Sequence, residues 1–112
     1  MAYLKLVGKN LDDHDVTFDV VSLPCRLGRL SSDSNSDYSI VLHGSDPLIS
    51  RLHASLYYDE SHKKIFIKCH SKNGLMVNKM RYKENDEIEL KQNSAIKIGH
   101  SKLYVLLPID TS

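Results

Sequence analysis

Residues 53–69, HASLYYDESHKKIFIKC, carry the plainest fold signal in this sequence. Two runs rich in apolar, aromatic and β-branched residues, 53–58 and 64–69, enclose a polar cluster at 59–61. The two isoleucines of the second run alternate with other residues, which is the two-residue period of a strand with one face on a core. Short runs of this kind bounded by polar residues are typical of β-strands, so the stretch predicts two strands joined by a turn.

The same pattern recurs along the chain at intervals of about ten residues, the spacing expected of an all-β sandwich or barrel. Further strands are predicted at 2–7, 16–21, 25–27, 38–42, 75–77, 87–90, 95–98 and 102–107. No window shows the 3.6-residue apolar stripe of an amphipathic helix. We therefore expect an all-β fold, a two-sheet antiparallel β-sandwich of about ten or eleven short strands with binding loops at one end. Residues 1–112 are expected to form one domain, and the tail 110–112 suits either a frayed end or the cut edge of a larger protein.

Charge and cysteine content narrow the class of protein. Fifteen basic and fourteen acidic residues leave a net charge of +1, which argues against a protein that binds nucleic acid through bulk charge. Cys25 and Cys69 lie in apolar runs and form no Cys-x-x-Cys pair, so we expect buried reduced thiols and no metal site. No cofactor is expected. The sequence shows no signal segment and no apolar run near the ~20 residues of a membrane span, so we expect a soluble protein inside the cell.

Three polar islands stand where predicted strands meet turns: Gly28-Arg29, residues 50–53 (Ser-Arg-Leu-His) and residues 71–74 (Ser-Lys-Asn-Gly). They offer two guanidinium groups, an ammonium, two serine hydroxyls and a carboxamide, without an acid among them. This set suits a doubly charged oxyanion held on loops at one end of a scaffold. Asn73-Gly74 is also a strong hairpin signal because both residues tolerate positive φ, although alone it predicts only a turn.

The order Gly-Arg, Ser-Arg-x-His, Asn-Gly, Val-Asn resembles the forkhead-associated (FHA) domain, a phosphothreonine-binding β-sandwich. The resemblance spans nearly the whole chain and rests on Gly28-Arg29, Ile40, residues 49–54, Asn73-Gly74, Val77-Asn78 and residues 96–99. The spacing of Cys69 from Lys72-Asn73-Gly74 and the Ala-Ile-Lys-Ile run at 95–98 are similar to FHA domains of fork-head transcription factors. No fork-head DNA-binding winged helix is present in these residues.

The resemblance implies five ligand-binding residues. Arg29 and Ser50 are implied as primary phosphate ligands, and Arg51 as a further phosphate-facing residue. Lys72 would add an ammonium to the same pocket. Asn73 is implied to hydrogen-bond the main chain of the ligand and so fix its register. These side chains are therefore expected to converge at one rim of the sandwich.

Four other positions acquire implied roles. Gly28, His53 and Gly74 are expected to shape and brace the loops rather than to contact the ligand. Leu48 lies where some family members read the third residue after the phosphothreonine. Because leucine is uncharged, we expect a tolerant or apolar preference there.

The expected function is a phosphothreonine-peptide binding module that mediates phosphorylation-dependent protein–protein interaction in nuclear signalling or transcription regulation. The expected partner is a phosphothreonine-containing protein, and nothing in the sequence demands more than a monomer. DNA would be reached only indirectly, through an attached fork-head domain. The expected location is nuclear, with the cytoplasm as the alternative. Two other readings stay open: a sandwich that holds a partner without phosphate, and a nucleic-acid module that uses local clusters such as Lys63-Lys64 and residues 79–83.

Catalysis is not expected. A triad of Ser50, His53 and Asp46 can be drawn, but three residues along an extended strand span about 10 Å, too far for a nucleophile to bond a base unless the chain folds back. The sequence contains no Gly-x-Ser-x-Gly elbow, phosphate loop or His-Glu-x-x-His motif.

Overall fold

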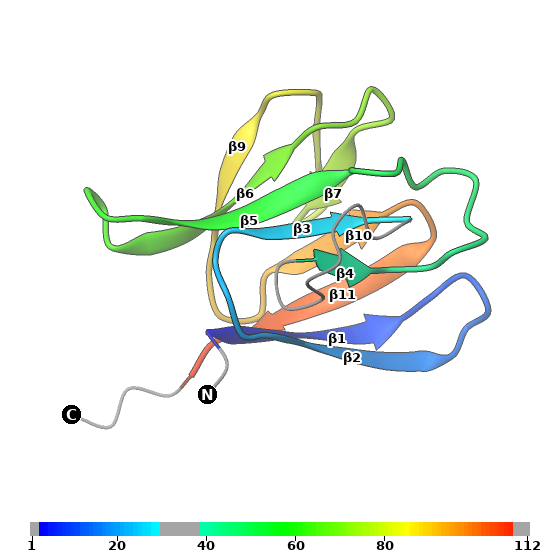
Figure 1. Ribbon diagram of the computed structural model, residues 1–112, viewed down its shortest axis with the longest axis horizontal. Coiled ribbons are helices and arrows are strands. Elements are labelled where there is room, and N and C mark those ends of the chain that lie inside the picture. Colours follow the sequence, from blue (N-terminus) through cyan, green and yellow to red (C-terminus); the bar gives the residue numbers. More distant parts are fainter. Residues whose placement is uncertain (1–2, 30–38, 109–112) are drawn as a thin grey trace.

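The computed structural model describes residues 3–29 and 39–108, which form eleven strands and no helix. The strands are β1 (Leu4–Lys9), β2 (Asp15–Val20), β3 (Cys25–Gly28), β4 (Ser39–Val41), β5 (Ala54–Asp59), β6 (Lys64–Cys69), β7 (Leu75–Val77), β8 (Met80–Tyr82), β9 (Glu87–Leu90), β10 (Ala95–Ile98) and β11 (Ser101–Leu106). A six-stranded sheet has the order β2-β1-β11-β10-β7-β8, and a five-stranded sheet has the order β4-β3-β5-β6-β9 (Figure 1). The predicted two-sheet all-β fold is confirmed. Over the described ranges there is accordingly no helix that could cross a membrane.

Four predicted strands, 64–69, 75–77, 87–90 and 95–98, have the bounds that the structure shows, and the others differ by one or two residues at one or both ends. Strand β8 was not predicted, because a run of three residues beside lysines carries no usable alternation. Residues 2 and 38, where two predicted strands begin, lie outside the described residues, as does the tail 110–112.

The core lies between the two sheets. Strand β11 alternates buried and exposed residues without exception, so that Ser101, Leu103 and Val105 face inward. The side chains of the core are Leu4, Leu6, Val20, Cys25, Leu27, Leu42, Ile49, Ala54, Leu56, Ile67, Cys69, Leu75, Val77, Leu90, Ile96, Ile98, Leu103 and Val105. Both cysteines are buried and free, as predicted, and burial raises the pKa of the Cys25 thiol to about 11.

The strand pairings bring several loops to one end of the sandwich. Strands β3 and β4 are paired in parallel, whereas the other pairings between described strands are antiparallel. The ends of β3, β4, β6 and β10 therefore meet the starts of β5, β7 and β11 at the same end (Figure 1). The Asn73-Gly74 turn joins β6 of one sheet to β7 of the other, so it is a turn between sheets rather than a hairpin.

Candidate functional site

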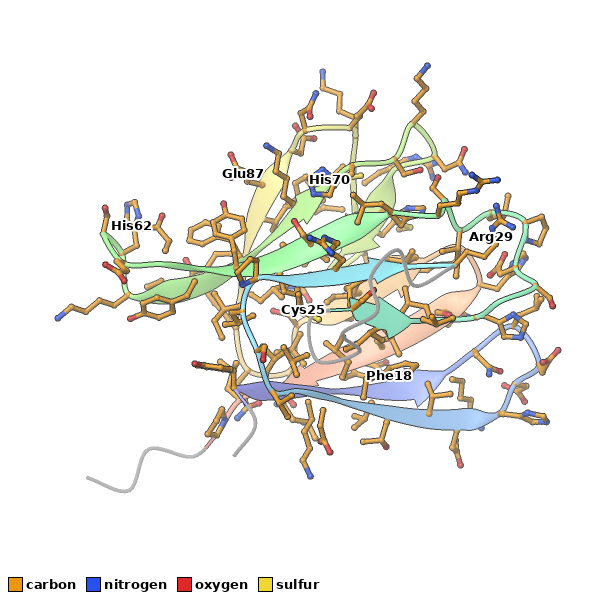
Figure 2. The ribbon with its side chains drawn as sticks, viewed as in Figure 1. Phe18, Cys25, Arg29, His62, His70 and Glu87 are labelled. Carbon is orange, nitrogen blue, oxygen red and sulfur yellow. The ribbon has the colours of Figure 1, made fainter. Side chains whose placement is uncertain are left out.

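Arg29 follows β3 directly and is fixed against the loop between β4 and β5 (Figure 2). Its backbone nitrogen donates to the carbonyl of Ser50 at 3.0 Å, and its Nε donates to the carbonyl of Ile49 at 3.0 Å. The preceding residue allows this approach, because a Cβ placed on Gly28 would lie 1.9 Å from the carbonyl oxygen of Arg51. Only glycine fits so close to a passing backbone. The first two polar islands therefore lie in contact.

His53 joins the second island to the third. It is fully buried, its Nδ1 accepts from the Ser50 backbone N–H at 3.0 Å, and its Nε2 lies 2.7 Å from the Gly74 carbonyl. Since Nδ1 accepts, the proton must be on Nε2, which donates to that carbonyl. Burial lowers the pKa of His53, against the smaller raising effects of the Gly74 carbonyl and of Asp46. The ring is thus a neutral two-ended link between loops.

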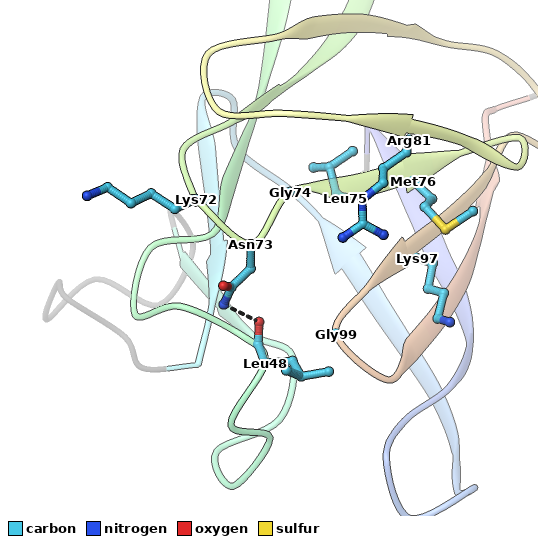
Figure 3. Close-up of a pocket in the computed structure, with 9 residues that line it drawn as sticks. All are labelled: Leu48, Lys72, Asn73, Gly74, Leu75, Met76, Arg81, Lys97 and Gly99. Atoms are coloured by element: carbon cyan, nitrogen blue, oxygen red, sulfur yellow. Dashed lines mark hydrogen bonds between the residues drawn. The ribbon is translucent and has the colours of Figure 1, made fainter.

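A chain of hydroxyl groups crosses the same gap. The Ser50 and Ser71 hydroxyl oxygens are 2.6 Å apart, and Ser71 Oγ also accepts from the Asn73 backbone N–H at 3.0 Å. The Asn73 carboxamide nitrogen donates to the Leu48 carbonyl at 3.0 Å, the bond drawn in Figure 3. Ser71 is buried, so it is a fixed part of this chain.

Asp46 stabilises the loop between β4 and β5 by joining it to the turn between β10 and β11. Its buried carboxylate accepts from the Leu48 backbone at 3.0 Å, from the His100 backbone at 2.8 Å and from His100 Nδ1 at 3.1 Å. Burial raises the pKa of Asp46, but these hydrogen bonds outweigh it and the pKa is lowered overall. Gly99, with φ of 57°, permits the contact, because a Cβ there would lie 2.8 Å from Asp46 Oδ2 and 2.6 Å from Ile49 Cγ1.

Of the five predicted ligand residues, Arg29, Ser50 and Asn73 are brought together by these bonds. Arg51 and Lys72 are exposed on the same loops, and neither forms an ion pair with another described residue. Their roles toward a ligand stay predictions.

A hollow of about 400 Å³ opens beside Asn73 (Figure 3). Its walls are Leu48, Lys72, Asn73, Gly74, Leu75, Met76, Arg81, Lys97 and Gly99. Leu48, the predicted specificity residue, is 47% exposed there. Figure 3 also shows Lys72 directed away from the side on which Arg81 and Lys97 lie.

The sequence analysis assigned no binding or bracing role to four residues of this region: Ser71, Asp46, Arg81 and Lys97. Serine and aspartate in a turn cluster indicate only the turn itself. Arg81 was noted only as part of a local basic cluster. Lys97 was noted only as one residue of the Ala-Ile-Lys-Ile run at 95–98. Their position beside Asn73 depends on which strands pair, and no local pattern encodes that.

The chain does fold back at residues 51–52 and brings Ser50 against His53, so distance alone does not exclude a catalytic pair. The contact, however, joins the ring to the main-chain nitrogen of Ser50. Both ring nitrogens are occupied, and the Ser50 hydroxyl is bonded to Ser71 instead. A general base must reach the proton that it removes, and His53 does not reach that hydroxyl.

Comparison with known proteins agrees with this geometry. The family model described as FHA domain matches residues 25–99. "Transcriptional activator FHA1" of Nicotiana tabacum is 29% identical over 108 residues, which are 96% of this chain and 49% of that protein. "Fork-head transcriptional regulator FHL1" of Candida albicans is 30% identical over 99 residues, 88% of this chain and 9% of that protein. The chain therefore spans less than half the length of these relatives.

Among solved structures, the MEK1 FHA domain in complex with a pThr peptide of HOP1 superposes with a TM-score of 0.70 at 21% identity. The match covers 97% of this chain and 100% of that one. At this identity the likeness shows the fold alone.

Proposed function

Because this chain belongs to the FHA family, we propose that it binds phosphothreonine peptides at Arg29, which follows β3, and at the loops that follow β4 and β6. The observation that carries the proposal is the set of bonds that fixes Arg29, Ser50 and Asn73 to one another's loops. A site whose donors are already held in place loses less entropy when it orders a flexible peptide.

The donors suit a phosphate group, which carries about −1.5 to −2 charges near neutral pH. The Nε of Arg29 is bonded to Ile49, so the terminal guanidinium nitrogens are the ones proposed to meet the phosphate oxygens. If Ser71 donates to Ser50, the proton of the Ser50 hydroxyl is left to donate to the anion, and the chain of hydroxyls strengthens that bond. Arg51 and Lys72 add exposed positive charge on the same loops.

The rough strength follows from these contacts. A hydrogen bond to a charged group contributes on the order of 1.5–3 kcal/mol, and two or three of them, less the ordering cost, correspond to roughly micromolar affinity. Binding should depend almost wholly on the phosphate.

The named relatives support the cellular setting that we propose. One is called a transcriptional activator and another a fork-head transcriptional regulator, and one solved neighbour holds a pThr peptide. We accordingly propose a nuclear role in phosphorylation-dependent assembly.

An oriented phosphothreonine peptide library, followed by calorimetry on the selected peptide with and without phosphate, tests this function. Arg29→Ala should abolish measurable binding, at a cost of about 1 kcal/mol in folding stability for the lost bond to Ile49. Lys91→Ala is the matched control, since Lys91 is an exposed cation in the turn between β9 and β10, at the other end of the sandwich. Equal affinity for the two forms of the peptide, or full binding by Arg29→Ala, would refute the proposal.

A further inference from the structure

The outer face of the six-stranded sheet carries a row of basic side chains. Lys97 of β10 lies opposite Lys102 of β11, which in turn lies opposite Lys9 of β1. On the other side, Met76 of β7 lies between Lys97 and Arg81 of β8. The row crosses five adjacent strands, about 19 Å at the usual ~4.8 Å spacing. We call Arg81, Lys97, Lys102 and Lys9 the basic row.

Most of this charge is not neutralised by the sheet itself. Lys9 pairs with Asp15 at 3.1 Å, but Arg81, Lys97 and Lys102 form no ion pair within the described part of the chain. Like charges directly opposite one another destabilise a sheet. The pairing of Lys97 with Lys102 is therefore a local cost that packing does not explain.

The outer face of the other sheet is built differently. There Lys68 lies opposite Glu87, which also accepts from the Tyr57 hydroxyl, and Lys64 pairs with Glu89 at 3.2 Å. Charges on that face are balanced by their neighbours. The surplus of positive charge is thus found on the face that carries the basic row, and not on the outer face of the five-stranded sheet.

The basic row is continuous with the candidate phosphate site. Lys97 lines the hollow beside Asn73 and also a second hollow of about 750 Å³, which extends over Val7, Lys102 and Tyr104. Figure 3 shows Arg81, Met76 and Lys97 side by side on the same flank of the first hollow. Tyr104, which is 52% exposed, lies two residues along β11 from Lys102, opposite Val7 and Ala95, and adds apolar surface beside the row.

We propose that the basic row binds a segment of two or three aspartate or glutamate residues next to the phosphothreonine of the same peptide. The inference rests on the proposed function, since the phosphothreonine anchors the peptide at the loops from which the row begins. A peptide fits better than a nucleic acid, because the surplus is three cations, the net charge is +1, and Asp13 and Asp15 border the far end of the second hollow.

The test compares three phosphothreonine peptides built on the library-selected sequence: one neutral, one with three glutamates after the phosphothreonine and one with three before it. Fluorescence anisotropy at ~50 mM salt should show one acidic peptide binding about 3- to 10-fold more tightly than the neutral one. The advantage should vanish near ~0.5 M salt, where the Debye length is only a few ångströms.

Two double variants isolate the row. Lys97→Gln with Lys102→Gln should remove the acidic advantage, so that the acidic and neutral peptides bind this variant with equal affinity. Lys63→Gln with Lys91→Gln removes the same charge at the opposite end of the sandwich and should leave the advantage intact. Thermal melts of both variants check that each is folded.

The inference is overturned if neither acidic peptide gains affinity, or if the Lys97/Lys102 variant keeps the gain. It is also overturned if mixed-sequence duplex DNA binds the row more tightly than the acidic peptides do, with loss in the same variant. Failure of the proposed function shows in a different comparison, as equal binding of the phosphorylated and unphosphorylated neutral peptides, neither of which carries the acidic segment.

Discussion

Lowering the pH from 7.5 to 5.5 should destabilise the domain through His53. Because burial lowers the pKa of this ring, the folded protein keeps it neutral while the unfolded chain takes up a proton below its ordinary pKa of about 6.5. The unfolded state then binds more protons, so stability falls as pH falls. Protonation in the folded state would place an N–H on Nδ1 against the Ser50 N–H, two donors facing each other.

The size of the effect follows from this linkage. A histidine that stays neutral when folded loses up to about 1.4 kcal/mol of stabilisation between pH 7.5 and 5.5. His70 acts in the same direction, since burial and then Lys68 lower its pKa. Asp46 contributes in another range, because its lowered pKa stabilises the fold above about pH 4 and that contribution is lost only on further acidification.

Urea unfolding at pH 7.5, 6.5 and 5.5 measures the loss, and His70→Gln separates the share of His53 from that of His70. His14→Gln, at an exposed histidine between β1 and β2, is the control and should leave the pH dependence as it is. Long-range ¹⁵N–¹H spectra of the imidazole should show the proton on Nε2 of His53. A proton on Nδ1 at pH 7.5, or stability in His70→Gln that is flat between pH 7.5 and 5.5, would refute the reasoning.

Three further outcomes are expected. Gly28→Ala forces a Cβ onto the Arg51 carbonyl and should lower the free energy of unfolding, measured in urea, by about 3 kcal/mol or more. Gly44→Ala, at a position with open space around it, should change that free energy by no more than about 0.5 kcal/mol. Equal stability of the two variants would contradict the close approach of Gly28 to Arg51. Ser71→Ala removes the hydroxyl that joins two loops and should cost about 1–2 kcal/mol and weaken phosphopeptide binding, so unchanged affinity would argue against the hydroxyl chain. The Cys25 thiol should react with an aromatic disulfide reagent only after unfolding, and rapid reaction in native buffer would contradict its burial.

Strands could be located from the sequence, but their partners could not. Alternation along a run reports that one face is buried, and it placed β6, β7, β9 and β10 to the residue. The parallel pairing of β3 with β4 and the return from β6 to the other sheet at Gly74 depend on contacts between distant segments. Short runs gain their strand conformation from such neighbours, which is why β8 escaped prediction.

The candidate site divides in the same way. The order of the polar islands pointed to Arg29, Ser50 and Asn73, because a family resemblance preserves residue type and sequence order. Ser71 and Asp46 have no distinctive chemistry in the sequence, and their importance comes from what they bond across the fold. The basic row is not a run of lysines at all, since its members come from four strands and meet only through the register of the sheet.

The position of β11 between β1 and β10 has a consequence for synthesis of the protein on the ribosome. After β1 and β2 have been made, the remaining edge of β1 has no partner until β11 is complete at Leu106, and the 86 residues between Val20 and Leu106 take about 4 to 17 s at ordinary translation rates. Over that interval the nascent hairpin exposes the apolar side chains of Leu4 and Leu6 and also an unpaired strand edge. Exposed apolar side chains and an unpaired edge each favour association with other chains. Holding chaperones would therefore matter most during elongation, before the last strand closes the larger sheet.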